Sequence, residues 1–316
     1  MVSPRRHRRA LAAGLLVLCC LCTALAQKAL PTAAKTTAQE DVFRILDTST
    51  GEILTVEARD FLPGAVVTEM TLYAHEEALK AQAVACYTYY AWERAKHTND
   101  AYDFTCNTKE WQAYVTPQEM QDRWGENYGA YMEILNRVTE AAAGYCLTQG
   151  GEPICATYFA ISSGKTENSA DVWGGELSYL SAVASPGDVY ARGYQTSAVF
   201  SAQELAETTG AALPAAGEEA SWVRVLSRTA SGTVTTVAIG DKTFTGGELR
   251  TALGLRSANF SVSYSAGQWT FLVKGWGHGV GMSQAGADYM ARRGFSFDEI
   301  LAWYYPGAEL SHTANG

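Results

Sequence analysis

Polar and aromatic side chains gather at three stretches that contain glycine and lie far apart in the sequence. These stretches surround Glu69, residues 162–173 and residues 275–287. Loops of this composition hold hydroxyl and aromatic groups beside open backbone N–H groups, which suits a neutral ligand with many hydroxyl groups. The three stretches together therefore predict a binding site for a glycan.

Two other kinds of site find less support in the same residues. Residues 164–166 read Gly-Lys-Thr, like the end of a phosphate-binding loop, but Phe159 stands where that motif requires its first glycine. Ser163, His278 and Asp171 could form a serine-hydrolase triad, yet Ser163 is not part of a Gly-x-Ser-x-Gly elbow. Serine in a glycine-rich loop more often stabilises a turn, so the glycan hypothesis is preferred.

The cysteines beyond residue 27 indicate buried thiols rather than a disulfide scaffold or a metal site. Cys86, Cys106, Cys146 and Cys155 could form two disulfides in three pairings, but four cysteines in so long a chain are sparse. Cys86 and Cys155 lie in apolar stretches, which favours burial. His97 and Cys106 supply two ligands where zinc takes three or four. We therefore expect no metal and no other cofactor.

The composition is that of an ordinary folded protein with an acidic surface. Of the 316 residues, 47% are hydrophobic and 18% are charged, and the net charge is −9. A negative net charge argues against a surface built to bind nucleic acid. An acidic protein that holds an anionic polymer must do so with local groups.

Residues 1–27 have the organisation of an export signal. Four arginines, Arg5, Arg6, Arg8 and Arg9, precede an uncharged apolar run from Ala10 to Ala26. The run ends in Ala-Leu-Ala, which resembles a cleavage site, yet its length of about 17 residues reaches the lower limit for a membrane-spanning helix. A cleaved signal peptide and an uncleaved signal anchor both stay open. Either one places the rest of the chain outside the cytoplasm.

Beyond a flexible tether at residues 28–40, the sequence predicts one α+β domain over residues 41–312, with helices and antiparallel strands around a glycan-binding cleft. Alternating apolar residues predict a hairpin over residues 42–56 and strands over 145–147 and 154–160. A run rich in alanine without Gly or Pro predicts a helix over 76–96, in which Glu76 pairs with Lys80.

Glycine, proline and capping residues mark the other boundaries. Pro63-Gly64 predicts a turn that is followed by a short segment ending at Glu69-Met70, and Gly144 ends a helix over 131–143. Residues 222–274 predict meandering antiparallel strands around a small helix at 247–253. The last glycine-rich loop enters a helix that Ser283 caps and Gly294 ends, and Ser296 with Glu299 forms a capping box for one more helix.

At the three polar stretches the sequence resembles the stage II sporulation protein D family, whose domain is shared with the amidase-enhancer protein of autolysin operons. The matching stretches are VVTEMTLYAHEEALKAQAVACYTYY, ISSGKTENSADVWGGELSYLSAV and GWGHGVGMSQAGADYMARRGFSFDEILAWYYPGAEL, in family order. The resemblance covers residues 42–310, and its last stretch is the most specific.

The resemblance implies a lytic transglycosylase that cuts peptidoglycan glycan strands from which the stem peptides have been removed. Glu69 matches the glutamate of the family's Glu-Met-Pro motif and is the implied catalytic acid. One carboxyl group suffices for this reaction, whereas an ordinary glycosidase needs a second carboxylate about 5–9 Å away. Val66, Val67 and Met70 beside Glu69 make a raised pKa plausible.

The same resemblance implies substrate-binding roles for residues on all three stretches. They are Gln82 on the helix after Glu69, Ser162, Ser163, Lys165, Thr166 and Trp173 on the second stretch, and His278, Ser283 and Gln284 on the third. Simpler roles compete with several of these. Gln82 can cap a neighbouring loop, Trp173 can pack in the core, and His278 can hold its own loop in place instead of contacting the catalytic carboxyl group or the sugar.

Two departures from the family pattern bear on activity. The family has arginine in AQAVAARTY where this chain has Tyr87, and if that arginine steadies the glutamate, another cation such as Lys165 or Arg94 must replace it here. The proline after Glu-Met is Thr71. Some members also carry cysteine and histidine pairs suggestive of zinc after the helix, and this chain lacks that pattern.

The resemblance also implies a setting, namely engulfment in a spore-forming bacterium, with a stage II sporulation protein P-type amidase and a membrane scaffold as partners. In that setting an anchored protein outside the cytoplasm is the preferred interpretation, and a secreted one follows if the signal is cleaved. The alternative function is a glycan-binding enhancer of a cell-wall amidase that has no activity of its own.

Overall fold

The computed structural model describes residues 41–312. The expected export signal and tether lie outside this range. Within it the chain folds as a mixture of helices and mainly antiparallel sheets, which confirms the α+β class. No helix among the described residues has both the length and the apolar character that crossing a membrane requires.

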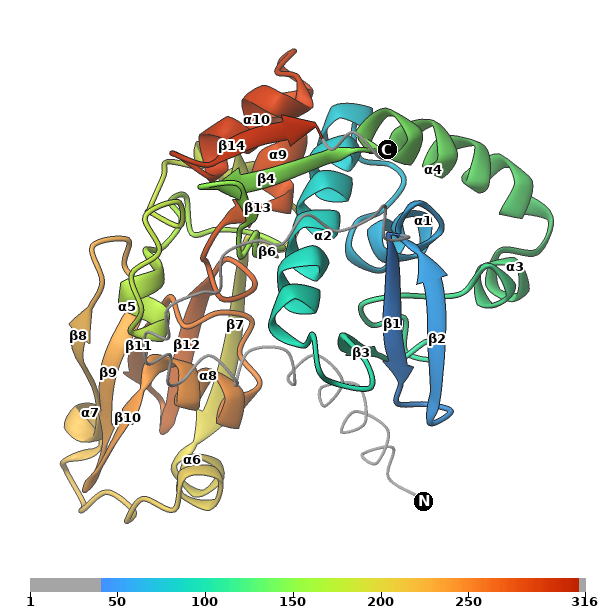
Figure 1. Cartoon of the computed structure of the whole chain (residues 1–316). Helices are drawn as coiled ribbons and strands as arrows, with labels where there is room; N and C mark the ends of the chain where they lie inside the picture. The colour runs from blue at the N-terminus through green and yellow to red at the C-terminus, as the bar shows by residue number, and fades with distance from the viewer. Residues whose placement is uncertain (1–40, 313–316) are drawn as a thin grey trace.

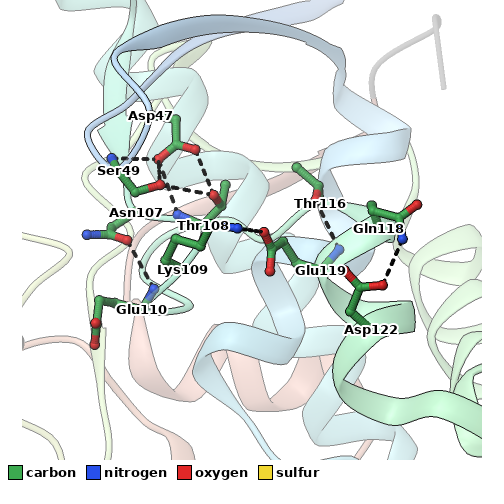
Figure 2. Close-up of polar contacts among 10 residues, drawn as sticks. All are labelled: Asp47, Ser49, Asn107, Thr108, Lys109, Glu110, Thr116, Gln118, Glu119 and Asp122. Atoms are coloured by element: carbon green, nitrogen blue, oxygen red, sulfur yellow. Dashed lines mark hydrogen bonds and ion pairs between the residues drawn. The ribbon is translucent and has the colours of Figure 1, made fainter.

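The chain begins with the expected hairpin. Strands β1 (Val42–Asp47) and β2 (Glu52–Glu57) are antiparallel, and β3 (Phe104–Cys106) pairs with β1 in parallel. Asp47 is buried and accepts hydrogen bonds from the backbone and hydroxyl groups of Ser49 and Thr108, as Figure 2 shows. This carboxylate therefore ties the hairpin turn to the loop that follows β3.

The turn predicted at Pro63-Gly64 is wrong, because both residues lie inside helix α1 (Ala58–Glu69). Burial of Phe61, Leu62 and their apolar neighbours against the core favours one continuous helix, and tertiary packing overrides the weak local preference for a turn. Gly64 is needed for packing, since a Cβ atom there would lie 2.2 Å from the carbonyl oxygen of Val115.

Helix α2 (Glu76–Lys96) has the expected bounds, and Figure 1 shows it running through the middle of the molecule. It packs against α1, α4 (Tyr128–Ala142) and elements near the C-terminus. The expected pairing of Lys80 is corrected: Lys80 bonds Glu77, while Glu76 bonds Arg137 on α4. The predicted helix over 131–143 is α4, with slightly earlier bounds.

A further helix, α3 (Pro117–Trp124), lies in a stretch where the sequence pattern indicated no element, and a 3-10 turn (Gly125–Asn127) joins it to α4. Its N-terminal signal is local, because Thr116 accepts a hydrogen bond from the backbone of Glu119 and Pro117 occupies the first turn. The helix is short and polar and buries only Met120, so it offers no apolar run that would have predicted it.

Two small sheets lie beside α2. Strand β4 (Tyr145–Gln149) pairs with β5 (Glu152–Pro153) and β14 (Glu309–His312), and β6 (Tyr158–Phe159) pairs in parallel with β13 (Met282–Ser283). The strand predicted over 154–160 is regular only at β6. A short helix, α5 (Ser169–Trp173), and a 3-10 helix (Pro186–Tyr190) follow β6 along the chain.

The antiparallel strands predicted over residues 222–274 are confirmed, and they belong to two three-stranded sheets, one of which also contains a strand N-terminal to the predicted range. One contains β8 (Val223–Arg228), β9 (Val234–Ile239) and β10 (Lys242–Thr245), and the other contains β7 (Gln195–Ser201), β11 (Phe260–Ser265) and β12 (Gln268–Lys274). Helices α6 (Ala202–Thr209), α7 (Glu219–Trp222) and α8 (Gly246–Leu253) accompany them. These elements share a core of their own, separate from the cores around α2.

Helices α9 (Gln284–Ala291) and α10 (Phe297–Tyr304) pack against α2 on the side away from α1 and α4 (Figure 1). The N-caps follow the sequence prediction: the Ser283 hydroxyl accepts from the backbone of Gly286, and Ser296 with Glu299 forms a capping box. The predicted end at Gly294 is corrected, since α9 ends at Ala291 with Arg292 as its C-cap. Cys86, Cys106, Cys146 and Cys155 are all buried and form no disulfide among the described residues, and the apolar sequence around two of them indicated this burial.

Candidate active site

Glu69 is the last residue of α1 and lies at the meeting point of α1, α2 and α9. Part of its side chain reaches the surface, although protein atoms surround the carboxyl group densely. Gln284, the first residue of α9, donates a hydrogen bond from Nε2 to Glu69 Oε2 at 3.4 Å. The first and third polar stretches of the sequence therefore come together at this carboxylate.

A chain of neutral polar groups continues from Gln284 into the core. Gln284 Nε2 also donates to Gln82 Oε1 at 3.3 Å, and Gln82 Nε2 lies 3.2 Å from Cys86 Sγ. The Cys86 thiol in turn donates to the hydroxyl of Tyr158 at 3.4 Å. Gln82 is fully buried, so its side-chain amide holds the Gln284 amide in orientation from the core side.

Burial raises the pKa of Glu69 to about 7, and the hydrogen bond from Gln284 opposes this rise only in part. The C-terminal end of α1 also disfavours a negative charge, because the helix dipole is negative there. Burial, followed by the charge of Glu69, raises the pKa of Cys86 to about 12, which keeps this thiol neutral. A carboxyl group with a pKa near 7 can both donate and accept a proton at neutral pH.

Tyr87, which stands where the family has arginine, points to a different part of the structure. Its hydroxyl donates to Asp41 at 2.8 Å, and its ring lies against Phe43. Arg94 forms an ion pair with the same aspartate at 2.7 Å. Tyr87 and Arg94 thus hold α2 against the start of β1 through their contacts with Asp41. The described hydrogen-bond partner of Glu69 is the Gln284 amide.

The hydroxyls of Ser162 and Ser283 meet at a buried aspartate that the sequence pattern did not indicate. Asp188 accepts from Ser162 at 2.5 Å and from Ser283 at 2.6 Å, and it is fully buried. Burial raises the pKa of Asp188, while the serine hydrogen bonds oppose the rise. Because Ser283 precedes Gln284, Asp188 fixes the start of α9 and with it the partner of Glu69.

His278 holds the third stretch in place through both ring nitrogens. Nε2 lies 3.0 Å from the carbonyl oxygen of Tyr158, and the backbone N–H of Val280 donates to Nδ1 at 3.2 Å, which assigns the proton to Nε2. Burial, together with the charge of Arg250, lowers the pKa of His278 to about 4. A neutral histidine with both nitrogens bound matches the loop-holding alternative. Trp173 packs against its ring, with 5.3 Å between the centroids.

The remaining residues of the second stretch divide between interior and surface. The hydroxyl of Thr166, which is buried, accepts from the backbone N–H of Val183 at 2.8 Å. Ser163 is half-buried and donates weakly to the carbonyl oxygen of Ser231, whereas Lys165 is exposed. Ser163 and Lys165 are therefore the members of this set that an outside ligand can reach.

Glu69 lines neither of two surface pockets that lie among the described residues. One lies between residues 184–187 and helices α9 and α10, and its lining is mainly apolar. The other lies beside His75 at the turn between α9 and α10. The glycan-binding cleft at Glu69 accordingly stays a prediction.

Sequence reasoning missed Asp188, Cys86 and Tyr158 as neighbours of the site. Cys86 could have been found, since it lies one helical turn after Gln82 and shares its face of α2. Asp188 could not be recognised from the sequence, because its partners Ser162 and Ser283 lie 26 and 95 residues away along the chain.

Comparison with known proteins shows which family the chain is related to. Residues 47–148 match the sequence profile of the family described as stage II sporulation protein. The stage II sporulation protein D of Bacillus amyloliquefaciens is 33% identical over 89% of this chain and 81% of its own length, and that of Bacillus subtilis is 31% identical over 84% and 77%.

A more distant relative is the amidase enhancer of Bacillus subtilis, which is 27% identical over 79% of this chain and 40% of its own length. The two closer similarities cover 89% and 84% of the chain, so both include the segment that carries Glu69. The chain belongs to the stage II sporulation protein D family.

Proposed function

We propose that this protein is a peptidoglycan lytic transglycosylase that cleaves peptide-free glycan strands during sporulation. Family membership and the amidase-enhancer relative support a cell-wall role in sporulation. The cleavage reaction is our inference from the site. The observation that carries it is the enclosed carboxyl group of Glu69, with a pKa near 7 and a neutral amide as its partner.

In the proposed reaction the Glu69 carboxyl group donates its proton to the glycosidic oxygen as the bond from that oxygen to the anomeric carbon breaks. The resulting carboxylate takes the proton of the 6-hydroxyl of the same sugar, whose oxygen attacks the anomeric carbon and closes a 1,6-anhydro ring. Glu69 ends protonated, as it began, and no water is consumed. General acid and base catalysis of this kind contributes about 10²–10⁴-fold.

The other residues take supporting or contacting roles in this proposal. Gln284 orients the Glu69 carboxyl group and Gln82 orients Gln284. The buried hydroxyls of Ser162, Thr166 and Ser283 shape the loops around the site. In this proposal the half-buried Ser163 and the exposed Lys165 contact sugar hydroxyl and acetamido groups, while Trp173 and His278 pack against each other.

The test is incubation of the purified protein with peptide-free glycan strands, followed by mass spectrometry for 1,6-anhydro-muramyl ends. We expect such ends from the wild type and a loss of at least 100-fold in Glu69→Gln. Glu76→Gln is the matched control, because Glu76 is an exposed carboxylate that bonds Arg137 on the helix surface, and it should keep full activity. Undiminished ends from Glu69→Gln would rule out the assignment.

The relative named as an amidase enhancer supports a second candidate, a glycan-binding module that assists a separate amidase without cleaving glycan. Absence of anhydro ends from the wild type, together with retained binding of glycan strands, would favour this second function. In either case we propose a location outside the cytoplasm, at the cell membrane, with a stage II sporulation protein P-type amidase as the partner.

A further inference from the structure

Trp276 and Arg256 form a stacked pair at the surface of the glycine-rich loop that leads to Gln284. The Arg256 guanidinium carbon lies 4.3 Å from the centroid of the Trp276 ring. Trp276 is 36% exposed, which is unusual for so large an apolar side chain. A planar ring and a planar cation therefore lie next to each other where a ligand can reach the tryptophan.

Backbone hydrogen bonds hold both members of the pair. Trp276 exchanges two bonds with Ile161, at 2.7 and 3.0 Å, and the N–H of Gly277 donates to the carbonyl oxygen of Arg256 at 3.0 Å. Gly193 leaves room for the guanidinium, since a Cβ atom there would lie 2.5 Å from Arg256 Nη1. The pair is thus built into the loop and costs little ordering entropy when a ligand binds.

The positive charge of Arg256 is not neutralised by an ion pair within residues 41–312. Its described hydrogen bond, to the carbonyl oxygen of Gly193, is long at 3.5 Å. A guanidinium has five N–H donors in a fork that fits a carboxylate. Arg250 adds to the positive potential, because its charge, besides burial, lowers the pKa of His278 on the same loop.

We propose that Trp276 and Arg256 form a subsite for a muramic acid residue whose lactyl carboxylate is free, with the sugar face on the indole ring and the carboxylate on the guanidinium. This inference rests on the proposed function. A stem peptide converts that carboxylate into a neutral amide, so the subsite favours strands from which peptides have been removed. Charge-assisted Arg–carboxylate hydrogen bonds are about twice as strong as neutral ones.

The test measures binding, so it does not depend on cleavage. The full chain carrying Glu69→Gln is titrated by calorimetry with a tetrasaccharide of alternating N-acetylglucosamine and N-acetylmuramic acid, once with free lactyl carboxylates and once with lactyl amides. We expect the amide form to bind about tenfold more weakly. Adding Arg256→Gln should weaken the acid form to the amide value and leave the amide form unchanged. Trp276→Ala should weaken both forms.

Arg123→Gln is the matched control, because Arg123 stacks on Trp111 at the same distance of 4.3 Å, on α3. It should change neither affinity. Arg256→Lys keeps the charge without the planar fork and should give an intermediate loss, and thermal unfolding checks that each variant is folded. The subsite would be overturned if Arg256→Gln weakened binding of both tetrasaccharides equally or of neither. It would also be overturned if neither tetrasaccharide bound measurably at millimolar concentration. If the wild-type protein formed no 1,6-anhydro ends, the proposed cleavage would be overturned, but the comparison of the two tetrasaccharide affinities would still stand.

Discussion

At the scale of single residues, the structure concentrates its chemistry in one carboxyl group. Glu69 is enclosed by α1, α2 and α9, and the groups that interact with its charge are Cys86 and Tyr90 on α2 and Tyr158 on β6. Burial raises the pKa of all three, so they are neutral at pH 7. None of these three neighbours carries a charge that would stabilise the Glu69 carboxylate against the cost of desolvation. Glu69 therefore keeps its proton up to neutral pH.

We expect kcat/KM for glycan cleavage to fall as pH rises through about 7. The general acid must be protonated in the free enzyme, and the pKa of Glu69 is about 7. Activity should therefore be constant between about pH 5 and 6 and should decrease about tenfold per pH unit above the pKa. Gln284→Leu removes a hydrogen bond that lowers this pKa and should move the descending limb to higher pH. A limb near the ordinary value of 4.5 would contradict the assignment.

The same pKa predicts a stability change in Glu69→Gln. A carboxyl group whose pKa is raised by folding favours the folded state while it is protonated, and this contribution is lost as pH rises through the folded pKa of about 7. Glutamine stays neutral at all pH values. Glu69→Gln should therefore change the free energy of unfolding little at pH 4.5 and raise it at pH 8, by on the order of 2 kcal/mol. Urea unfolding at both pH values measures this, and an equal effect at both would contradict it.

At the scale of elements, the position of helix α1, which carries Glu69, depends on its close packing against a neighbouring loop. Helix α1 approaches the loop before α3 at Gly64, where no Cβ atom fits beside Val115 and Tyr114. In contrast, nothing lies within 4 Å of a Cβ atom built on Gly129 of α4. The two helical glycines differ in their surroundings and not in their intrinsic helix preference.

Gly64→Ala should lower the free energy of unfolding by about 2–3 kcal/mol, because α1 must move away from the loop. Gly129→Ala should leave it unchanged or raise it by up to about 1 kcal/mol, since alanine is the better helix former. Thermal and urea unfolding of both variants check this. Equal effects of the two substitutions would show that packing at Gly64 is not the cause.

Two buried aspartates bound by hydroxyl groups allow a matched test of how α9 is held. Asp188 binds Ser162 and Ser283, whereas Asp47 binds Ser49 and Thr108 at the hairpin (Figure 2). We expect Asp188→Asn to reduce kcat by about tenfold, because Gln284 moves relative to Glu69. Asp47→Asn should destabilise the fold by about 1–3 kcal/mol while the folded enzyme keeps its kcat. Similar kcat losses in both would assign Asp188 a general structural role.

At the scale of the whole molecule, the sheets of residues 195–274 have their own core, and α2 organises the rest. The glycine-rich loop leaves β12 and reaches α9, so it joins the two parts at the candidate site (Figure 1). Because few large side chains are shared between the cores, local unfolding of one part need not include the other.

Phe271→Ala should reduce amide-exchange protection mainly within residues 195–274, since this fully buried ring belongs to that core. The expected cost is about 3–5 kcal/mol. Phe43→Ala, which removes an equally buried ring from the core of β1 and α1, should show the reverse pattern. Loss of protection across all of residues 41–312 in either variant would indicate a single cooperative unit.

The sequence by itself determined the hairpin, helix α2 and the N-caps of α9 and α10, because these depend on alternation, helix preference and hydrogen bonds between residues a few positions apart. It also determined the family, through its three motif stretches. Only the tertiary structure decided that α1 continues through Pro63-Gly64, since packing outweighed the local turn signal. It also decided that Gln284 contacts Glu69 from 215 residues away. The raised pKa of Glu69 depends on what surrounds the carboxyl group in the folded chain, which no local pattern encodes.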